Sequence, residues 1–251
     1  MIKNIWVLTM FDDYFDAFLE YGVIGKVFRN ERSTSIKYRF NVVSIPKFCK
    51  KGFKGVDDPP FGGGVGMIMR PDVLKTALIE GVIKPGGYDI EKIKSQLHII
   101  CPAPRGRAWS QDEAKSFAHE HLSPSSGKDI IFICGRYEGI DERFLESYVD
   151  QYISLGDYIL TGGELAVMTI LDSSMRFSDG VLGNKLSALD ESFADDKLEY
   201  ALYTRPKEFE GTSVPEELVS GNHKRIEEFK RKSSVEMTKK YRPDLINKNK
   251  Y

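Results

Sequence analysis

Three apolar segments of this chain end in turns rich in glycine or proline, and each turn is followed by a sequence with helical periodicity. The apolar segments are His98–Cys101, Asp129–Cys134 and Tyr152–Leu160. The sequences that follow them are Gln111–Glu120, Glu142–Tyr148 and Glu164–Phe177. Short apolar strands that alternate with helices are typical of a parallel sheet with crossover helices. We therefore expect an α/β fold.

The turn after the second apolar segment reads GRYEGIDER, residues 135–143, and concentrates polar side chains. Six of them fall within eight positions: Arg136, Tyr137, Glu138, Asp141, Glu142 and Arg143. The other two turns read PAPRGR, residues 102–107, and TGGE, residues 161–164. Loops at the carboxyl ends of neighbouring parallel strands converge on one site, and their glycines expose backbone groups that suit a flat heterocycle or a ribose. Taken alone, GRYEGIDER fits an ordinary strand-to-helix turn with surface charges equally well.

The length and composition are those of a soluble globular protein. With 251 residues, of which 41% are hydrophobic and 29% charged, the chain can hold a full α/β domain and a smaller second one. No apolar stretch approaches the length of a membrane span, and Met1–Met10 lacks the architecture of a signal peptide. Cys49, Cys101 and Cys134 are odd in number and far apart, which favours reduced, buried cysteines. We expect a cytoplasmic protein without membrane contact.

The net charge of −1 conceals an uneven distribution. Residues 224–250 carry ten Lys and Arg against four Asp and Glu, a balance of +6, so the remainder of the chain has a balance of −7. A basic, mainly helical segment on an acidic body favours a polyanionic partner, and nucleic acid fits such a segment best. The alternative is a solvated, charged helix face, which is the commoner origin of a single charge run.

Apolar spacing and the positions of glycine and proline in the rest of the chain predict the order of elements and domains. We expect strands at Ile5–Met10 and Ser35–Ser44, helices at Phe11–Phe28 and Pro71–Gly81, and a loop at Cys49–Gly66. Residues 178–196 are rich in small, acidic and glycine residues and predict a linker. The expected organisation is an α/β domain over residues 1–177, the linker at 178–196, and a helical domain over residues 197–251.

A glycine-rich loop, DDPPFGGGVGM at Asp57–Met67, matches neither common nucleotide-binding motif. Met67 follows Gly66 where a phosphate-binding loop requires lysine, and the glycine spacing differs from the dinucleotide fingerprint. Two acids, two prolines and four glycines still predict a shaped lid or substrate loop. His119 and His121 have no third ligand at metal spacing, so we expect no zinc site. No Ser–His–Asp arrangement can be argued from the sequence.

Several of these segments together resemble a known family, the bacterial tRNA (guanine-N1)-methyltransferases of the TrmD type, which belong to the SPOUT superfamily. The resemblance extends in one order over nearly the whole chain. The matching segments are DDPPFGGGVGM, GRYEGIDER, SLGDYILTGGELAVM, MRF, YTRP, VPEELVSGNHKRIEEF and TKKYRPDL. The resemblance implies a parallel sheet with a deep trefoil knot, which composition and periodicity do not indicate, and a small helical C-terminal domain. It also implies a homodimer, S-adenosylmethionine (SAM) as methyl donor, guanosine 37 of tRNA as acceptor, and a dependence on Mg²⁺.

The resemblance also implies roles for individual residues. The three turns would bind SAM through Pro102, Pro104, Gly106, Gly135, Tyr137, Glu138, Gly139, Ser154, Leu155, Gly156, Tyr158, Leu160, Gly162 and Gly163. Among these, Glu138 would face the positively charged end of SAM, and Arg176 would contact the target guanine and steady charge at its O6. The basic C-terminal domain would grip the anticodon stem-loop. The residues assigned to the RNA are Asp57, Gly62, Gly63, Gly64, Ser220, Asn222 and His223.

Two positions depart from the family pattern. Ala166 replaces the usual proline after GGEL, a mild change. The family motif that supplies the catalytic base ends in Asp-Ser-Phe, whereas this chain reads LDESF, which puts Glu191 in register and makes Asp190 the alternate base. Two other functions remain open: a SAM-binding RNA-binding protein without transferase activity, and a SPOUT methyltransferase that acts on another RNA position. No oxygen-ligand cluster for Mg²⁺ can be picked out, so no metal ligands are assigned.

Overall fold

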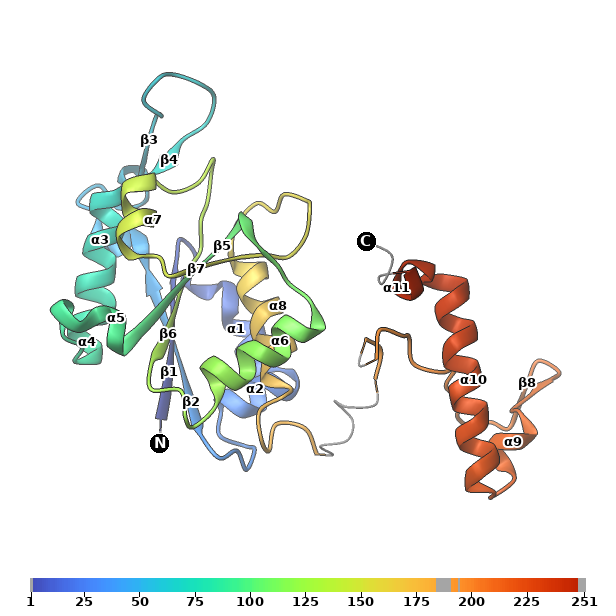
Figure 1. Cartoon of the computed structure of the whole chain (residues 1–251). Coiled ribbons are helices and arrows are strands. Elements are labelled where there is room, and N and C mark those ends of the chain that lie inside the picture. The colour runs from blue at the N-terminus through green and yellow to red at the C-terminus, as the bar shows by residue number, and fades with distance from the viewer. Residues whose placement is uncertain (1, 184–190, 194, 248–251) are drawn as a thin grey trace. The chain divides into compact units, whose positions relative to one another are not determined.

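The computed structural model describes residues 2–183, 191–193 and 195–247. Contacts within the chain divide it into two compact units, Met1–Gly183 and Asn184–Tyr251 (Figure 1). This division falls inside the segment that we predicted as a linker, residues 178–196. Each unit is described by itself below. None of the helices in the described residues is long and apolar enough to cross a membrane.

The first unit is built on a five-stranded, entirely parallel sheet, as the sequence predicts. The strand order is β2 (Lys37–Ser44), β1 (Ile2–Thr9), β6 (Asp129–Ile133), β5 (Leu97–Ala108) and β7 (Gln151–Ser154). The three apolar segments of the sequence therefore supply the neighbouring strands β6, β5 and β7. Their turns leave the sheet at the same edge, which is the arrangement that forms a ligand site in α/β folds.

Helices cover both faces of this sheet and bury an apolar cluster on each (Figure 1). In β1, Ile5 and Val7 point to one face, whereas Trp6 and Leu8 point to the other, as the two-residue period of a strand requires. The first face packs against α1 (Asp16–Glu20), α2 (Gly22–Phe28), α6 (Gln111–Phe117) and α8 (Glu164–Met175). The second packs against α3 (Pro71–Leu78) and α7 (Glu142–Tyr148), with α4 (Lys84–Gly86) and α5 (Ile93–Gln96) on the same side.

Three predicted helices differ from the structure in their details. The helix predicted at Phe11–Phe28 is divided into η1 (Asp12–Phe15), α1 and α2, because Tyr21 is extended and Gly22 has a φ of 74°. The helix at Pro71 continues past Leu78 as a π-helical turn, η4 (Ile79–Ile83). The helix that begins at Gln111 likewise continues as the π-helical turn η6 (Ala118–Leu122). Short 3₁₀ turns occupy η2 (Ile45–Phe48), η3 (Gly52–Gly55) and η5 (Ile90–Lys92).

Two predicted strand ends are wrong. We expected the strand at His98–Cys101 to stop at Cys101, but β5 runs to Ala108 and contains an irregularity, since Ile153 of β7 pairs with both Pro102 and Arg107. Proline lacks the N–H that a ladder needs, so the segment between these partners bulges out of the sheet. Conversely, the strand that we expected at Tyr152–Leu160 ends at Ser154, because the following residues leave the sheet as a loop.

The second unit is mainly helical, as predicted. Its elements are β8 (Glu208–Phe209), β9 (Thr212–Ser213), α9 (Glu216–Val219), α10 (His223–Tyr241) and α11 (Pro243–Asn247). An extended segment lies along α10 and is fixed to it by side-chain hydrogen bonds. Leu198 N–H donates to Thr238 Oγ1 at 2.9 Å, and Ala201 N–H donates to Ser233 Oγ at 3.0 Å. These bonds tie the start of the unit to its longest helix.

Candidate functional site

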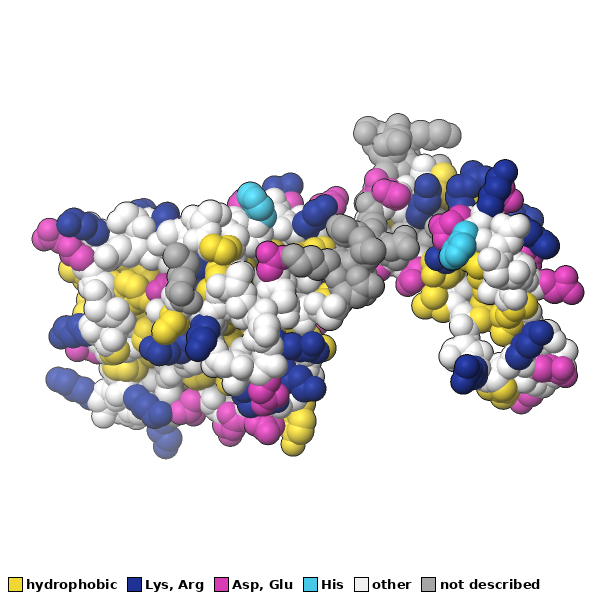
Figure 2. Space-filling view, turned by 90° about the horizontal axis from the view of Figure 1, so that it is seen from below, with side chains coloured by type: hydrophobic (Ala, Val, Ile, Leu, Met, Phe, Trp, Pro, Cys, Tyr) yellow, Lys and Arg dark blue, Asp and Glu magenta, His cyan; other side chains and the backbone are white. Residues whose placement is uncertain are grey.

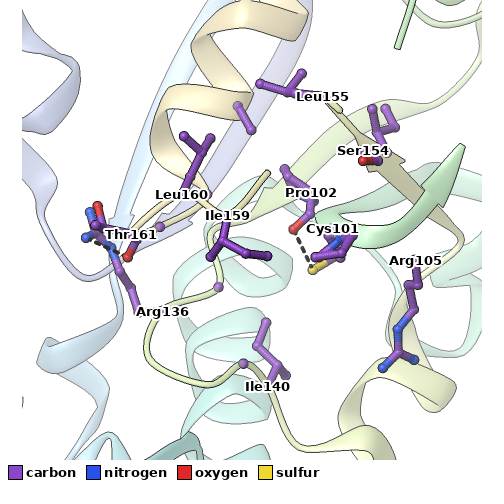
Figure 3. Close-up of a pocket in the computed structure, with 18 of the residues that line it drawn as sticks. Cys101, Pro102, Arg105, Arg136, Ile140, Ser154, Leu155, Ile159, Leu160 and Thr161 are labelled. Atoms are coloured by element: carbon purple, nitrogen blue, oxygen red, sulfur yellow. Dashed lines mark hydrogen bonds between the residues drawn. The ribbon is translucent and has the colours of Figure 1, made fainter. Parts of the chain in front are cut away.

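The bulge in β5 and the loops after β6 and β7 enclose one cavity of about 420 Å³ (Figure 3). In the close-up, Arg136 and Thr161 lie on one side of the cavity and Arg105 on the other. The structure thus brings together most of the residues assigned to SAM: Pro102, Pro104, Gly135, Tyr137, Glu138, Gly139, Ser154, Leu155, Gly156, Tyr158, Leu160, Gly162 and Gly163. These positions lie in the β5 bulge, at the end of β7 and in the loops after β6 and β7, and they become neighbours only through the parallel sheet.

Gly106 is the one predicted cofactor residue that does not line the cavity. A Cβ at this position would collide with the backbone of Ile153, so the bulge of β5 crosses β7 in close contact. Only glycine permits that approach. Gly106 therefore affects the shape of the pocket indirectly, because it lets the β5 bulge lie against the neighbouring strand β7.

The GRYEG turn has an uncommon backbone conformation. Tyr137 has a φ of 58°, in the left-handed region that few non-glycine residues occupy, and Gly139 has a φ of 131°. Gly139 N–H donates to Arg136 O at 3.1 Å and closes the turn. The Tyr137 side chain is 44% exposed, and its partial burial and the nearby Asp57 raise the pKa of its phenol. A strained residue held in a pocket wall is typical of a ligand site.

A buried ion pair connects the GRYEG turn to the TGGE turn. The Glu164 carboxylate is 1% exposed, and Arg136 Nη2 lies 2.8 Å from its Oε2 in ionic contact without hydrogen-bond geometry. Glu164 Oε1 accepts hydrogen bonds from Arg136 Nε at 3.3 Å and from Thr9 Oγ1 at 2.7 Å. Arg136 also donates to Thr161 O at 3.2 Å, and its guanidinium lies 4.6 Å from the ring centroid of Phe11. We call this Arg136–Glu164 pair the clasp.

Two glycines of the TGGE turn are required by close contacts beside the clasp. A Cβ at Gly162 would collide with the Arg136 guanidinium and would lie 2.6 Å from Glu164 Oε2. A Cβ at Gly163 would lie 2.8 Å from the Cα of Cys134, at the end of β6. Gly163 N–H also donates to Gly135 O at 3.1 Å, which joins the two turns directly. The pocket is therefore assembled by backbone packing as much as by side chains.

The glycine-rich loop lies between two short strands, β3 (Asp57–Asp58) and β4 (Ile68–Met69), and its base joins the pocket wall. Glu138 N–H donates to Met67 O at 3.0 Å, and Met69 N–H donates to Gly139 O at 2.9 Å. Gly62, Gly63 and Gly64 all have positive φ values, from 79° to 127°, and none of them lines the cavity. The structure therefore places this predicted substrate loop beside the pocket and outside it.

The cysteines are free, and two of them are buried. Burial raises the pKa of the Cys101 thiol to about 12 and raises that of Cys134 well above its usual range. Both thiols are therefore neutral and poor nucleophiles at physiological pH. Cys49 is half-buried. The chemistry of the pocket has to come from other groups.

The three candidate catalytic residues fall in different parts of the chain. Arg176 follows α8 directly, in the first unit, whereas Glu191 belongs to the second unit. Asp190, the alternate base, lies outside the described residues. Next to Glu191, Ser192 Oγ accepts a hydrogen bond from Glu199 N–H at 3.0 Å, and Phe193 N–H donates to Lys197 O at 2.7 Å. Glu191 therefore stands at the edge of a hydrogen-bonded turn.

The remaining predicted RNA-binding residues lie at the start of α10. Asn222 caps this helix, since its side chain accepts hydrogen bonds from Lys224 N–H at 3.1 Å and Arg225 N–H at 3.3 Å. Ser220 and His223 flank this cap and are exposed. Lys and Arg side chains are spread over the surface of the second unit in the view of Figure 2. This surface is suited to a polyanion.

Several cavity residues were not assigned from the sequence. They include Cys101, Ala103, Arg105, Arg136, Ile140, Leu145, Ile153, Ile159, Thr161 and Ala166. Arg105 joins the β5 bulge to α7, since its guanidinium donates to the two oxygens of Glu142 at 2.6 and 2.9 Å. The many polar residues of GRYEGIDER could have indicated Arg136 as a site residue. They could not indicate its pairing with Glu164, which lies 28 residues further along the chain. Among the described residues, no group of three or more His, Cys, Asp or Glu side chains could hold a metal ion.

Comparison with known proteins agrees with the resemblance. The family model described as tRNA (Guanine-1)-methyltransferase TrmD matches residues 3–248. Proteins named tRNA (guanine-N(1)-)-methyltransferase are similar over nearly their whole length. That of Lactobacillus delbrueckii subsp. bulgaricus is 37% identical over 245 residues, covering 98% of this chain and 89% of the relative. Those of Sulfurihydrogenibium sp. and Clostridium perfringens are 40% and 41% identical, covering 98% of this chain and 89% and 94% of the relatives. The chain therefore belongs to the tRNA (guanine-1)-methyltransferase TrmD family.

Proposed function

We propose that this protein transfers a methyl group from SAM to N1 of guanosine 37 in tRNA. The observation that carries this proposal is the family match over residues 3–248, which includes every loop of the cavity. Relatives that cover nearly the whole chain are named for the same guanine-N1 reaction. The cavity at one edge of the parallel sheet is the candidate site for that reaction.

The cavity fits SAM in size and in chemistry. Its volume of about 420 Å³ lies in the range of small-molecule sites. Apolar side chains such as Leu155 and Leu160 suit the adenine ring, and the glycines of the loops leave backbone groups accessible to ring nitrogens and ribose hydroxyls. Glu138 brings a carboxylate to the lining, where it would attract the positively charged sulfonium and ammonium groups.

The residues of the chain have to make guanine N1 nucleophilic. N1 carries a proton at neutral pH, and we assign the Glu191 carboxylate to accept that proton as N1 attacks. The Arg176 guanidinium would stabilise the negative charge that develops on O6. When bound, SAM supplies the methyl group: the N1–C bond forms, the S–C bond breaks, and the sulfonium becomes a neutral thioether. Asp190 is the alternate base.

The proposal extends to the assembly of the enzyme. We propose a cytoplasmic homodimer whose cavity loops form a deep trefoil knot and whose second unit grips the anticodon stem-loop of tRNA. Support for the last point comes from the exposed basic residues of α10, such as Lys224, Arg231 and Lys239. Mg²⁺ dependence is proposed from the family alone. Since the described residues offer no metal-holding cluster, we assign the ion no ligands and derive no step through it.

Methylation of defined transcripts tests the function. The protein is incubated with labelled SAM and tRNA transcripts that carry G or A at position 37, with G or another base at position 36. Label should enter only the G37 transcripts, and more of it when position 36 is also G. Equal labelling of A37 transcripts would contradict the assignment to G37. SAM binding without transfer to any transcript would favour a non-catalytic RNA-binding protein.

A further inference from the structure

The loop between β3 and β4 exposes two hydrophobic side chains almost completely. Phe61 is 99% exposed and Val65 is 88% exposed, the two highest values among the large hydrophobic residues of the described chain. In Figure 1 this loop projects from the first unit, beyond β3 and β4. An aromatic ring that packs on nothing within its own unit gains nothing from the hydrophobic effect, so it calls for a partner.

The end of this loop is fixed by hydrogen bonds to the GRYEG turn, which lines the cavity. Its last residues are hydrogen-bonded to the GRYEG turn through Met67 O and Met69 N, at 3.0 and 2.9 Å. Gly66 packs against Glu138 so closely that a Cβ would overlap that side chain. On the other side of the hairpin, Arg70 pairs with Asp58 at 3.2 Å. The base of this loop is therefore joined to the cavity wall, while Phe61 itself lies on the projecting part of the loop and does not line the cavity.

Basic residues precede the loop in the chain and favour a polyanionic partner. Lys50, Lys51 and Lys54 are exposed in the segment immediately before β3. Lysines that precede an exposed aromatic residue by a few positions are suited to unpaired nucleic acid, because cations contact phosphates while bases stack on an aromatic ring. A protein partner fits less well, since two apolar side chains separated by three glycines bury too little area for a stable interface.

We propose that Phe61 is an RNA-binding residue whose ring stacks on an unpaired base of the substrate, next to the base that enters the cavity. This inference rests on the proposed function and adds a contact to it. Gly62, Gly63 and Gly64, which have positive φ, let the loop adjust so that the ring meets the base face to face. Lys50, Lys51 and Lys54 hold the backbone of the same RNA strand.

Substitution at position 61 separates stacking from simple hydrophobic contact. Phe61→Ala removes the ring, Phe61→Leu keeps an apolar side chain without a π-face, and Phe61→Trp enlarges the face. We expect Phe61→Ala and Phe61→Leu to weaken binding of the anticodon stem-loop about tenfold, as loss of one stacked base does, and Phe61→Trp to bind at least as tightly as the unaltered protein. SAM affinity should stay the same in all three. Val65→Ala is the matched control on the same loop and should bind RNA normally.

A spectroscopic readout supports the affinity measurement. The indole of the Phe61→Trp protein should be quenched by the stem-loop and remain unchanged by SAM alone, after subtraction of the signal from the unaltered protein, which contains Trp6 and Trp109. An RNA affinity of Phe61→Leu equal to that of the unaltered protein would overturn stacking. A changed oligomeric state of Phe61→Ala with normal RNA binding would overturn the RNA assignment in favour of a protein contact. Failure of the unaltered protein to methylate G37 transcripts would instead overturn the proposed function.

Discussion

The two units of this chain build binding surfaces in opposite ways. The first unit buries an apolar cluster on each face of its sheet, and its cavity is formed by loops in close backbone contact. In the described part of the second unit only Ser233, Thr238 and Leu245 are buried, and its long helix exposes mainly charged side chains. The shape of such a cavity can be changed by a single added atom. The affinity of a charged surface is the sum of many small contributions.

This contrast predicts different responses to mutation. In the first unit, one added Cβ at Gly162 or Gly163 meets atoms that have little room to move. In the second unit, one lost charge on α10 would remove a single contact of a flexible side chain with the proposed RNA substrate. The candidate catalytic groups are divided between the two, since Arg176 belongs to the first unit and Glu191 to the second. The strongest tests of the comparison therefore begin with these two residues.

Removal of the proposed base should have the largest effect. An amide at position 191 cannot accept the N1 proton, so Glu191→Gln should lower methyl transfer by about 10²- to 10⁴-fold, which is the usual contribution of general-base catalysis. SAM affinity, measured by calorimetry, should not change, because the cavity belongs to the first unit. Asp190→Asn is the matched control and should cost much less. The reverse order of the two effects would place the base one residue earlier.

Loss of Arg176, the arginine after α8, should have the second-largest effect on methyl transfer. Arg176→Ala removes the charge that would stabilise O6 in the transition state, and we expect kcat to fall by about 10²- to 10³-fold, as for other donors to a developing oxyanion. Arg176→Lys should restore part of kcat, because it keeps the charge and loses the planar fork. Single-turnover assays with saturating SAM and tRNA measure the step directly. Normal turnover of the alanine variant would exclude Arg176 from catalysis.

Opening the clasp tests whether the cavity is as rigid as its contacts indicate. Glu164→Gln leaves the Arg136 guanidinium without its anionic partner, and we expect the free energy of unfolding to fall by roughly 2–4 kcal/mol. Since the clasp joins two cavity loops, the Kd for SAM should rise about tenfold, while the Kd for tRNA stays near its normal value. Thr9→Val removes one hydrogen bond to Glu164 without a charge and should have a smaller effect. Reduced stability with normal SAM binding would make the clasp structural only.

The strands and the location of the cavity could be predicted because they depend on local signals. Runs such as Asp129–Cys134 are short, apolar and β-branched, which favours buried strands, and the turns after them carry the glycines. Parallel pairing then gathers those turns at one edge. This reasoning anticipated that the three turns meet at one site. The individual cofactor residues were implied by the family resemblance, and lining residues such as Arg136 and Thr161 were not assigned.

What could not be predicted depends on contacts between distant segments. The length of β5 is decided by the pairing of Arg107 and Ala108 with β7, which no local pattern reveals. Gly106 looks like any turn glycine until the backbone of Ile153 is seen against it. The partners Arg136 and Glu164 each lie in a recognisable motif, but only the folded chain shows that they pair. The exposure of Phe61 is likewise a property of the fold and not of its composition.

Neutralising charge on α10 should produce a modest and graded loss. Arg231→Gln with Lys239→Gln should lower the slope of log affinity for tRNA against log salt by about 2, because each phosphate contact contributes about one unit. SAM binding should not change. Lys115→Gln, an exposed substitution on α6 in the first unit, serves as the control for loss of charge. An affinity that does not depend on salt would exclude the basic surface as the RNA contact.

The last prediction, with the smallest expected signal, tests whether the proposed base and the cavity that it would serve come from the same chain. We propose that, in the homodimer, the base of one subunit serves the cavity of its partner. Glu191→Gln disables the base, and Gly162→Val disables the cavity by pushing into the clasp, so each homodimer alone should be inactive. After subunit exchange, half of the dimers are mixed and each has one intact site, so activity should return to about a quarter of that of the unaltered protein. If base and cavity belonged to one chain, every site would carry a defect, and no activity would return despite exchange.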